Sequence, residues 1–127
     1  MEDYLTLKTT QAGINMIIRT LYGDSITFTK IAIGDGNPTN LESVTDLTHK
    51  VLEFGLTEAE AKENYMLLTG NITSRDVPVS FYGYELGVYA KGSDGVEKLY
   101  AYRYSKSDVD YYPSSSSGRT LELTMSI

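Results

Sequence analysis

The chain has no cysteine, no tryptophan and a single histidine among its 127 residues. Without cysteine it can form no disulfide, no thiolate metal site and no thiol nucleophile. The one imidazole, His49, cannot build a histidine-rich metal centre within one chain. Three copies around a symmetry axis could contribute one His49 each, but a surface histidine is the simpler interpretation. Because no G-x-S-x-G motif is present either, we expect a protein that is not an enzyme and that binds no metal or other cofactor.

Long apolar runs are also missing, since none exceeds the four residues of Tyr65-Met66-Leu67-Leu68. Such a run is far too short to cross a bilayer, and the acidic start Met1-Glu2-Asp3 is not followed by a signal-peptide core. The net charge of −6 disfavours nucleic acids and anionic membranes as partners. With 41% hydrophobic and 22% charged residues, the composition is typical of one globular domain spanning residues 1–127.

Helical periodicity is clearest over residues 9–22. Apolar residues recur there at i, i+3, i+4 and i+7, namely Ile14, Ile17, Ile18 and Leu21, and Met16 can widen this stripe. Thr9 or Thr10 can cap the helix, and Gly23 stands where a left-handed residue often ends one. We expect the stripe to face the core.

After residue 25 the period changes from 3.6 to 2, which indicates strands. The expected strands cover residues 26–33, 50–56, 65–73, 84–91, 97–104 and 119–127. Residues 37–48 favour a short helical turn, residues 57–64 fit either a short helix or a charged loop, and residues 105–118 suit a flexible loop. The pattern predicts a β-rich α+β fold, with one amphipathic helix on a mainly antiparallel sheet or sandwich of five to seven strands.

Residues 84–104 contain the best hairpin signal, because Asp94-Gly95 lies between two alternating segments. Strict alternation puts one set of residues on a core face: Leu86, Val88, Ala90, Leu99 and Ala101. The opposite face then carries Tyr89, Tyr100, Tyr102 and Tyr104, with a gap at Gly87. Tyrosine buries a large ring yet tolerates water at its hydroxyl, so these four side chains are candidate partner-binding residues. Cross-strand stacking, or cover by the helix, would explain them equally well.

A strand that enters a glycine-bracketed turn, Phe28-Thr29-Lys30-Ile31-Ala32-Ile33-Gly34-Asp35-Gly36, is the most distinctive segment. Its branched and aromatic residues favour a strand, and Gly-Asp-Gly-Asn-Pro favours a sharp turn. Asp35 could bind a cation, but a turn residue whose carboxylate bonds its own backbone is the favoured interpretation. The spacing after Asp35 also departs from a calcium loop.

This segment resembles a signature of the phage tail-collar fibre family, found at the N-terminus of tail fibres in contractile phages and phage-tail-like bacteriocins. Further similar stretches follow the family order along the chain: Thr10-Gln11-Ala12-Gly13, Tyr84-Glu85-Leu86-Gly87-Val88-Tyr89-Ala90, Leu99-Tyr100-Ala101 and Asp110-Tyr111-Tyr112-Pro113. Residues 50–64 show no pattern of the family. The chain stops in or just after its last expected strand, and the family's shaft and receptor-binding tip are absent, so we expect a fragment or a short variant.

The resemblance implies a structural virion component, or a component of a phage-tail-like particle, made in the bacterial cytoplasm. Its expected role is to attach a host-recognition tail fibre to the baseplate, so its partners would be baseplate or tail proteins. A homotrimer is implied for the full fibre, although no coiled-coil heptads are present. A carbohydrate-binding module that uses the same tyrosine rings is the alternative, and a carboxylate-dependent hydrolase is a third hypothesis.

Overall fold

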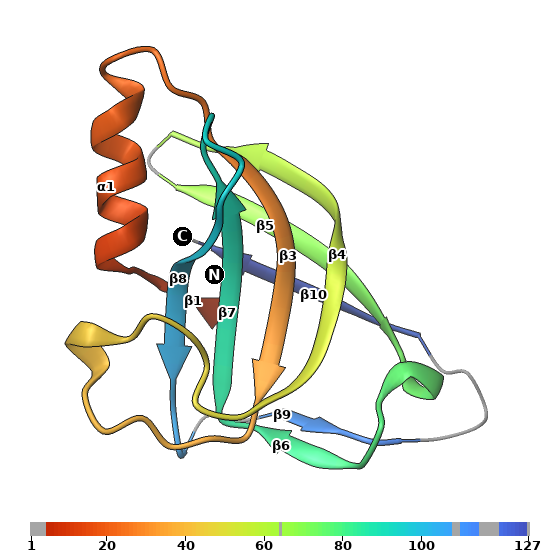
Figure 1. Ribbon diagram of the computed structural model, residues 1–127. Coiled ribbons are helices and arrows are strands. Elements are labelled where there is room, and N and C mark those ends of the chain that lie inside the picture. Colours follow the sequence, from red (N-terminus) through yellow and green to blue (C-terminus); the bar gives the residue numbers. More distant parts are fainter. Residues whose placement is uncertain (1–4, 64, 108–109, 115–119, 127) are drawn as a thin grey trace.

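Figure 1 shows the computed structural model of the chain, which describes residues 5–63, 65–107, 110–114 and 120–126. It is β-rich, with one helix packed on a mostly antiparallel sheet, as the sequence predicts. The elements in chain order are β1 (Leu5–Thr6), β2 (Lys8–Thr9), α1 (Gln11–Thr20), β3 (Thr27–Gly34), the 3-10 turn η1 (Leu41–Ser43), β4 (Lys50–Ala61), β5 (Met66–Thr73), the 3-10 turn η2 (Ser74–Asp76), β6 (Phe81–Gly83), β7 (Glu85–Lys91), β8 (Glu97–Tyr104), β9 (Asp110–Tyr112) and β10 (Thr120–Ser126).

The main sheet has the strand order β1-β10-β5-β4-β3-β7-β8-β2. All neighbours are antiparallel except β1 and β10. The two outermost strands, β1 and β2, are separated in the chain by Leu7 alone. The chain therefore joins both edges of the sheet, which closes on itself. Leu7 is only 3% exposed at this junction.

Strand β4 is longer than predicted and belongs to both halves of the closed sheet. Its first half pairs with β3, and its second half pairs with β5 after an irregularity between Leu56 and Glu58. The segment 57–61, for which the sequence favours a short helix or a charged loop, is therefore strand. Pairing with β5, for example Ala59 opposite Leu68, supplies the backbone hydrogen bonds that decide this.

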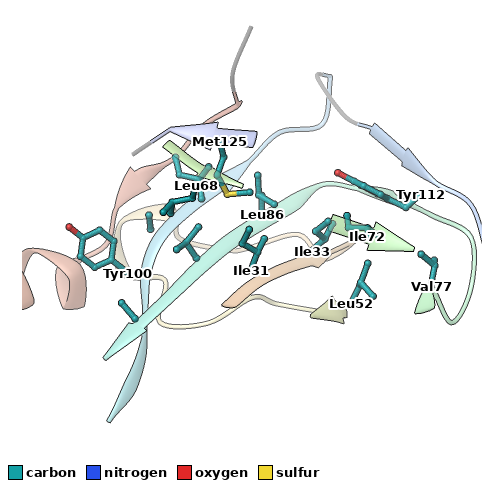
Figure 2. Close-up of a cluster of buried hydrophobic side chains, with 14 of the residues drawn as sticks. Ile31, Ile33, Leu52, Leu68, Ile72, Val77, Leu86, Tyr100, Tyr112 and Met125 are labelled. Atoms are coloured by element: carbon teal, nitrogen blue, oxygen red, sulfur yellow. The ribbon is translucent and has the colours of Figure 1, made fainter. Parts of the chain in front are cut away.

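The main core lies inside the closed sheet. Figure 2 shows labelled side chains from β3, β5, β7 and β10 pointing into one cluster, among them Ile31, Leu68, Leu86 and Met125. Because β4 lies between the neighbouring strands β10 and β5 and the neighbouring strands β3 and β7, the sheet must curve to bring side chains of both pairs into one cluster. Ile31, Leu68 and Met125 are fully buried.

Helix α1 packs beside β8 (Figure 1). It does not do so through the face that its apolar stripe predicts. Only Gly13 and Met16 are buried, whereas Ile14, Ile17 and Ile18 are 42–50% exposed. A Cβ on Gly13 would lie 2.3 Å from the Tyr100 carbonyl oxygen. The missing side chain lets the helix backbone approach β8 on that side, so the prediction that the stripe faces the core is wrong.

The ends of α1 follow the sequence signals closely. Thr10 is the N-cap, and its hydroxyl accepts a hydrogen bond from the Gly13 N–H at 3.1 Å. The Thr10 N–H donates to the Tyr100 carbonyl at 2.9 Å, which ties the cap to β8. Gly23 has a positive φ of 94°, as expected for a residue that reverses the chain after a helix.

Connection 35–49 covers the outer face of the central strands and forms a second cluster there. Its Leu47 packs with Ala32, Tyr89, Leu99 and Tyr102, all of them buried. The expected short helical turn is present in this connection as η1. The sheet is therefore covered on both faces in this region, which has direct consequences for the tyrosines.

A small second sheet, β6–β9, lies beside the end of the main sheet (Figure 1). It was not predicted, because β9 falls within the expected flexible loop 105–118. Residues 108–109 and 115–118 of that loop lie outside the described residues. Tyr112 is 3% exposed and stacks on Phe81 with ring centroids 5.4 Å apart, and this apolar contact holds β9 in place.

Candidate functional site

A buried carboxylate lies at the centre of the most distinctive sequence segments. Glu85, the first residue of β7, is fully buried. Its Oε2 accepts hydrogen bonds from the backbone N–H groups of Gly36 and His49, both at 3.0 Å. Its Oε1 accepts from the Thr48 N–H at 2.7 Å and from the Tyr102 hydroxyl at 2.6 Å. The carboxylate thus joins both ends of connection 35–49 to the sheet.

The glycines of the turn are explained by this carboxylate. A Cβ on Gly36 would lie 2.6 Å from Glu85 Oε2, and a Cβ on Gly34 would lie 2.3 Å from the His49 carbonyl oxygen. Both distances are shorter than real Cβ contacts allow, so side chains are excluded at both positions. The two glycines of the Gly-Asp-Gly sequence therefore allow close packing around Glu85.

Burial would by itself raise the pKa of Glu85, because the charged form loses its hydration. The hydrogen bonds from Tyr102, His49 and Thr48 outweigh burial and hold the pKa below its usual range. Glu85 is therefore ionised at neutral pH. A general acid would need the opposite shift, so this carboxylate is suited to anchoring the backbone.

Asp35 and His49 meet above this anchor. The Asp35 N–H donates to the His49 carbonyl at 3.1 Å, and the Asp35 carboxylate contacts His49 Nδ1. Asp35 is thus a turn residue, as predicted. Its carboxylate, however, bonds the His49 imidazole, whereas the prediction was a bond to its own backbone. The His49 side chain is 70% exposed, in agreement with a surface histidine. Within the described residues, no group of three or more acidic or histidine side chains is placed to hold a metal ion.

The four tyrosines selected from the sequence do not form one exposed face. Tyr89, Tyr100 and Tyr102 are only 5–7% exposed, and Tyr104 is partly buried. The alternation also breaks, because Val88 pairs with Ala101 while Tyr89 pairs with Leu99. Tyr100 is the extra residue of this bulge.

The bulge changes which face two residues occupy. Leu99 joins the outer cluster with Tyr89 and Tyr102, whereas Tyr100 joins the main core, where its ring meets Phe28 edge-on at 5.0 Å. Gly87 leaves a gap as expected, but the Leu47 side chain fills it, since a Cβ there would lie 2.6 Å from Leu47 Cδ1. The tyrosine face was mispredicted because neither the bulge nor connection 35–49 can be read from strand periodicity.

Tyr89 lies inside a network of charged side chains. Its hydroxyl donates to Asp46, and the ammonium groups of Lys30 and Lys50 lie 4.8 and 4.9 Å from its ring centroid. Both lysines also pair with Glu53, at 2.5 and 3.1 Å. The hydrogen bond and ion pair with Glu53 raise the pKa of Lys30, although partial burial by itself would lower it. Both lysines of this network are thus paired with a carboxylate.

A groove opens between the start of α1, η1 and the end of β8. Its volume is about 410 Å³. Apolar side chains in its lining include Ile14, Leu41 and Val44, and Tyr104 is the one selected tyrosine that lines it while remaining partly exposed. Lys8 and Arg103 add positive charge to this lining in a chain whose net charge is −6.

Next to this groove, α1 and the two residues that follow it, Leu21 and Tyr22, present an apolar surface to solvent. The exposed fractions are 42% for Ile14, 44% for Ile17, 50% for Ile18, 82% for Leu21 and 86% for Tyr22. We call this set the α1 outer face. Ile14 belongs to both the α1 outer face and the groove. No helix in the described part of the chain is long and apolar enough to cross a membrane.

The sequence stretches that carry the family resemblance contact one another in the structure. Strand β3 pairs with β7, and Glu85 anchors the Gly34–Gly36 turn. The helix start at Thr10–Gly13 packs against Tyr100. Strand β9 pairs with β6, which lies outside these stretches, but its Tyr112 belongs to the main core cluster with Ile33 and Leu86. All of these stretches therefore build the scaffold. Glu85 was missed as a key residue, although it is the only charge in the segment 84–90.

Comparisons with known proteins add no relative: no family model matches the chain, and no significant match was found among curated proteins or solved structures.

Proposed function

We propose that this chain is a structural module of a phage tail or phage-tail-like particle, and that it attaches a tail fibre to the baseplate. The proposal rests on one observation: the stretches similar to the tail-collar fibre family meet in space as parts of one scaffold, centred on Glu85 and on the contact between α1 and β8. A rigid closed sheet suits a part that transmits load and performs no chemistry. The expectation that the protein is not an enzyme stays a prediction.

The groove is the contact surface that we propose for the baseplate protein. Tyr104 keeps its place as a candidate partner-binding residue because it lines the groove beside the exposed Leu41. Apolar walls next to Lys8 would accept a segment that combines apolar and acidic side chains. Tyr102 also lines the groove but is buried, and Tyr89 and Tyr100 are buried and do not line it.

Incorporation into particles tests this proposal. The chain is expressed in a bacterium together with the genes that flank its own gene, and purified particles are probed for it. Leu41→Asp should reduce incorporation at least tenfold, because a charge would enter the apolar lining. Val79→Asp is the matched control, since Val79 is 60% exposed and Leu41 is 58% exposed. Absence of the unmodified chain from particles, or equal incorporation of both variants, would contradict the proposal.

The copy number and location follow from the same resemblance and are proposed with it. Three copies per complete fibre and a place in the virion, or in a phage-tail-like particle, are the expected arrangement. Counting copies per purified particle by quantitative mass spectrometry would test both.

Carbohydrate binding is a second candidate function, and the rings that could carry it differ from those selected from the sequence. Tyr82 and Tyr111 are 52% and 51% exposed on the small sheet, with ring centroids 5.0 Å apart. Exposed aromatic rings can stack on sugars, which the buried tyrosines cannot do. Binding to a glycan array that is lost in the Tyr82→Ala/Tyr111→Ala variant would favour this function. If the same variant is still incorporated normally into particles, carbohydrate binding and attachment to the baseplate use different surfaces.

A further inference from the structure

We infer that the α1 outer face is an interface at which a second copy of this chain packs, helix against helix. The inference goes beyond the proposed attachment function and does not depend on it. Ile14, Ile17, Ile18 and the C-cap Leu21 lie within one arc of about 100° at 3.6 residues per turn, and Tyr22 follows in the turn after the helix. Gly13 and Met16, which pack on β8, lie on the other side of the helix. The larger apolar face of the helix is thus exposed to solvent, while its smaller face contacts the rest of the protein.

The area of this face is sufficient for self-association. From their exposed fractions, the five side chains present on the order of 500 Å² of apolar surface, if a fully exposed large side chain contributes about 150–200 Å². This value is near the upper end for the largest apolar patch of a monomer. Two copies packed through the face would bury about 1,000 Å² together, which is the size of a small, weakly associating interface. We therefore expect self-association that becomes visible as the concentration rises.

Charge also favours a second copy at this face over most other surfaces of the chain. The chain carries a net charge of −6, so two copies repel one another in general. Between residues 9 and 23 the sequence has one charged residue, Arg19, and no acidic residue. The Arg19 guanidinium lies 3.7 Å from the Asp94 carboxylate of the same chain, which offsets its charge. Two such faces can therefore meet without bringing like carboxylates together.

The spacing of the side chains fits helix–helix packing. Residues at i, i+3, i+4 and i+7 form the ridge that one helix inserts between the ridges of another. A partner helix with the same pattern is supplied by a copy of this chain. Ile17 and Ile18 lie in the middle of the stripe, so in either relative orientation of the two helices they come close to their counterparts.

Sedimentation velocity of the purified chain over a range of concentrations tests the inference. The unmodified chain should sediment above its monomer mass of 14.1 kDa as the concentration rises. Ile18→Glu should weaken association at least tenfold, because it places a charge in the centre of the interface. Val79→Glu is the matched control, since Val79 is 60% exposed and lies away from α1 beside β6. Monomer at all concentrations, or association unaffected by Ile18→Glu, would overturn the inference.

Cross-linking provides a second readout that does not depend on affinity. Because the chain has no cysteine, an introduced cysteine can form a disulfide only between copies. Mild oxidation of Ile17→Cys should give a covalent dimer, whereas Val79→Cys should stay mostly monomeric at the same concentration. Equal yields from the two variants would show that the α1 outer face has no preference for a second copy. Far-ultraviolet circular dichroism of each variant confirms that it is folded.

Discussion

Replacing Glu85 by glutamine is the sharpest test of how the fold is held together. Glu85 accepts four hydrogen bonds, three from backbone N–H groups and one from the Tyr102 hydroxyl. Glutamine has nearly the same shape, but one of its two oxygens becomes an NH₂ group. An NH₂ group cannot accept from Gly36 and His49, nor from Thr48, so at least one backbone donor is left unpaired and buried.

The expected cost is about 2–4 kcal/mol in the free energy of unfolding. Each hydrogen bond to a charged group contributes roughly 1.5–3 kcal/mol, and an unsatisfied buried donor costs about 1–3 kcal/mol. The Tyr102 hydroxyl can rotate to accept from the new NH₂ group, which limits the loss. Because domains of this size are stable by only about 5–15 kcal/mol, the change should be readily measured.

Denaturant unfolding followed by circular dichroism gives the free energy directly. Glu97→Gln is the matched control on β8, because the Glu97 side chain is 38% exposed and bonds Thr29 and Lys30 near the surface. It should cost less than about 1 kcal/mol. Amide hydrogen exchange should also speed up at Gly36, Thr48 and His49 in the Glu85 variant. A cost below about 1 kcal/mol with unchanged exchange would refute the role of Glu85 as an anchor.

The pH dependence of the same variant follows from the direction of the pKa shift. The pKa of Glu85 is lower in the folded chain than in the unfolded chain. Its contribution is therefore fully present above the unfolded pKa of about 4.3 and is lost as the pH falls through the folded pKa. The stability difference between the natural chain and Glu85→Gln should be constant near neutral pH and shrink below about pH 4. A difference that grows on acidification would mean that the sign of the shift is wrong.

Two further substitutions test the packing of the helix and the closure of the sheet, both by denaturant unfolding. Met16→Ala should lower the free energy of unfolding by about 2–4 kcal/mol, because Met16 is only 7% exposed. Ile17→Ala should lower it by less than about 1 kcal/mol at low protein concentration. The reverse order would mean that the apolar stripe faces the core after all. Leu7→Ala should lower the free energy of unfolding by about 2–5 kcal/mol, because Leu7 is buried where the chain joins both edges of the sheet. It should also increase amide exchange in β8 and β10. Unchanged exchange in both strands would argue against this closure.

Most strands were predictable because their signals are local. The hairpin of β7 and β8 follows from Asp94-Gly95 and the flanking alternation, and Gly95 has the expected positive φ of 74°. Thr10 and Gly23 likewise mark the helix ends through their own backbone preferences. The short strands β1, β2, β6 and β9 escaped prediction because two or three residues carry too little periodicity, so pairing with distant partners decides them.

The candidate sites were less predictable, since they depend on what covers each face. Alternation placed Tyr89 and Tyr102 correctly on the outer face of the sheet, but connection 35–49 buries them there. Glu85 becomes an anchor only because Gly36, Thr48 and His49 bring their backbone N–H groups to it. These contacts join residues that are separated by 36 to 49 positions in the sequence. A local sequence pattern cannot predict contacts over such a separation.

The sequence by itself determined the class of fold, the glycine-bracketed turn and the limits of the helix, because backbone conformation and side-chain alternation are properties of short segments. Only the tertiary structure decided which face of the helix is buried. Gly13 shows the reason. Because it has no Cβ, the helix backbone approaches the β8 backbone at Tyr100 more closely than it could if an apolar side chain lay between them. Steric fit between distant backbones thus outweighed the hydrophobic stripe and left it exposed to solvent.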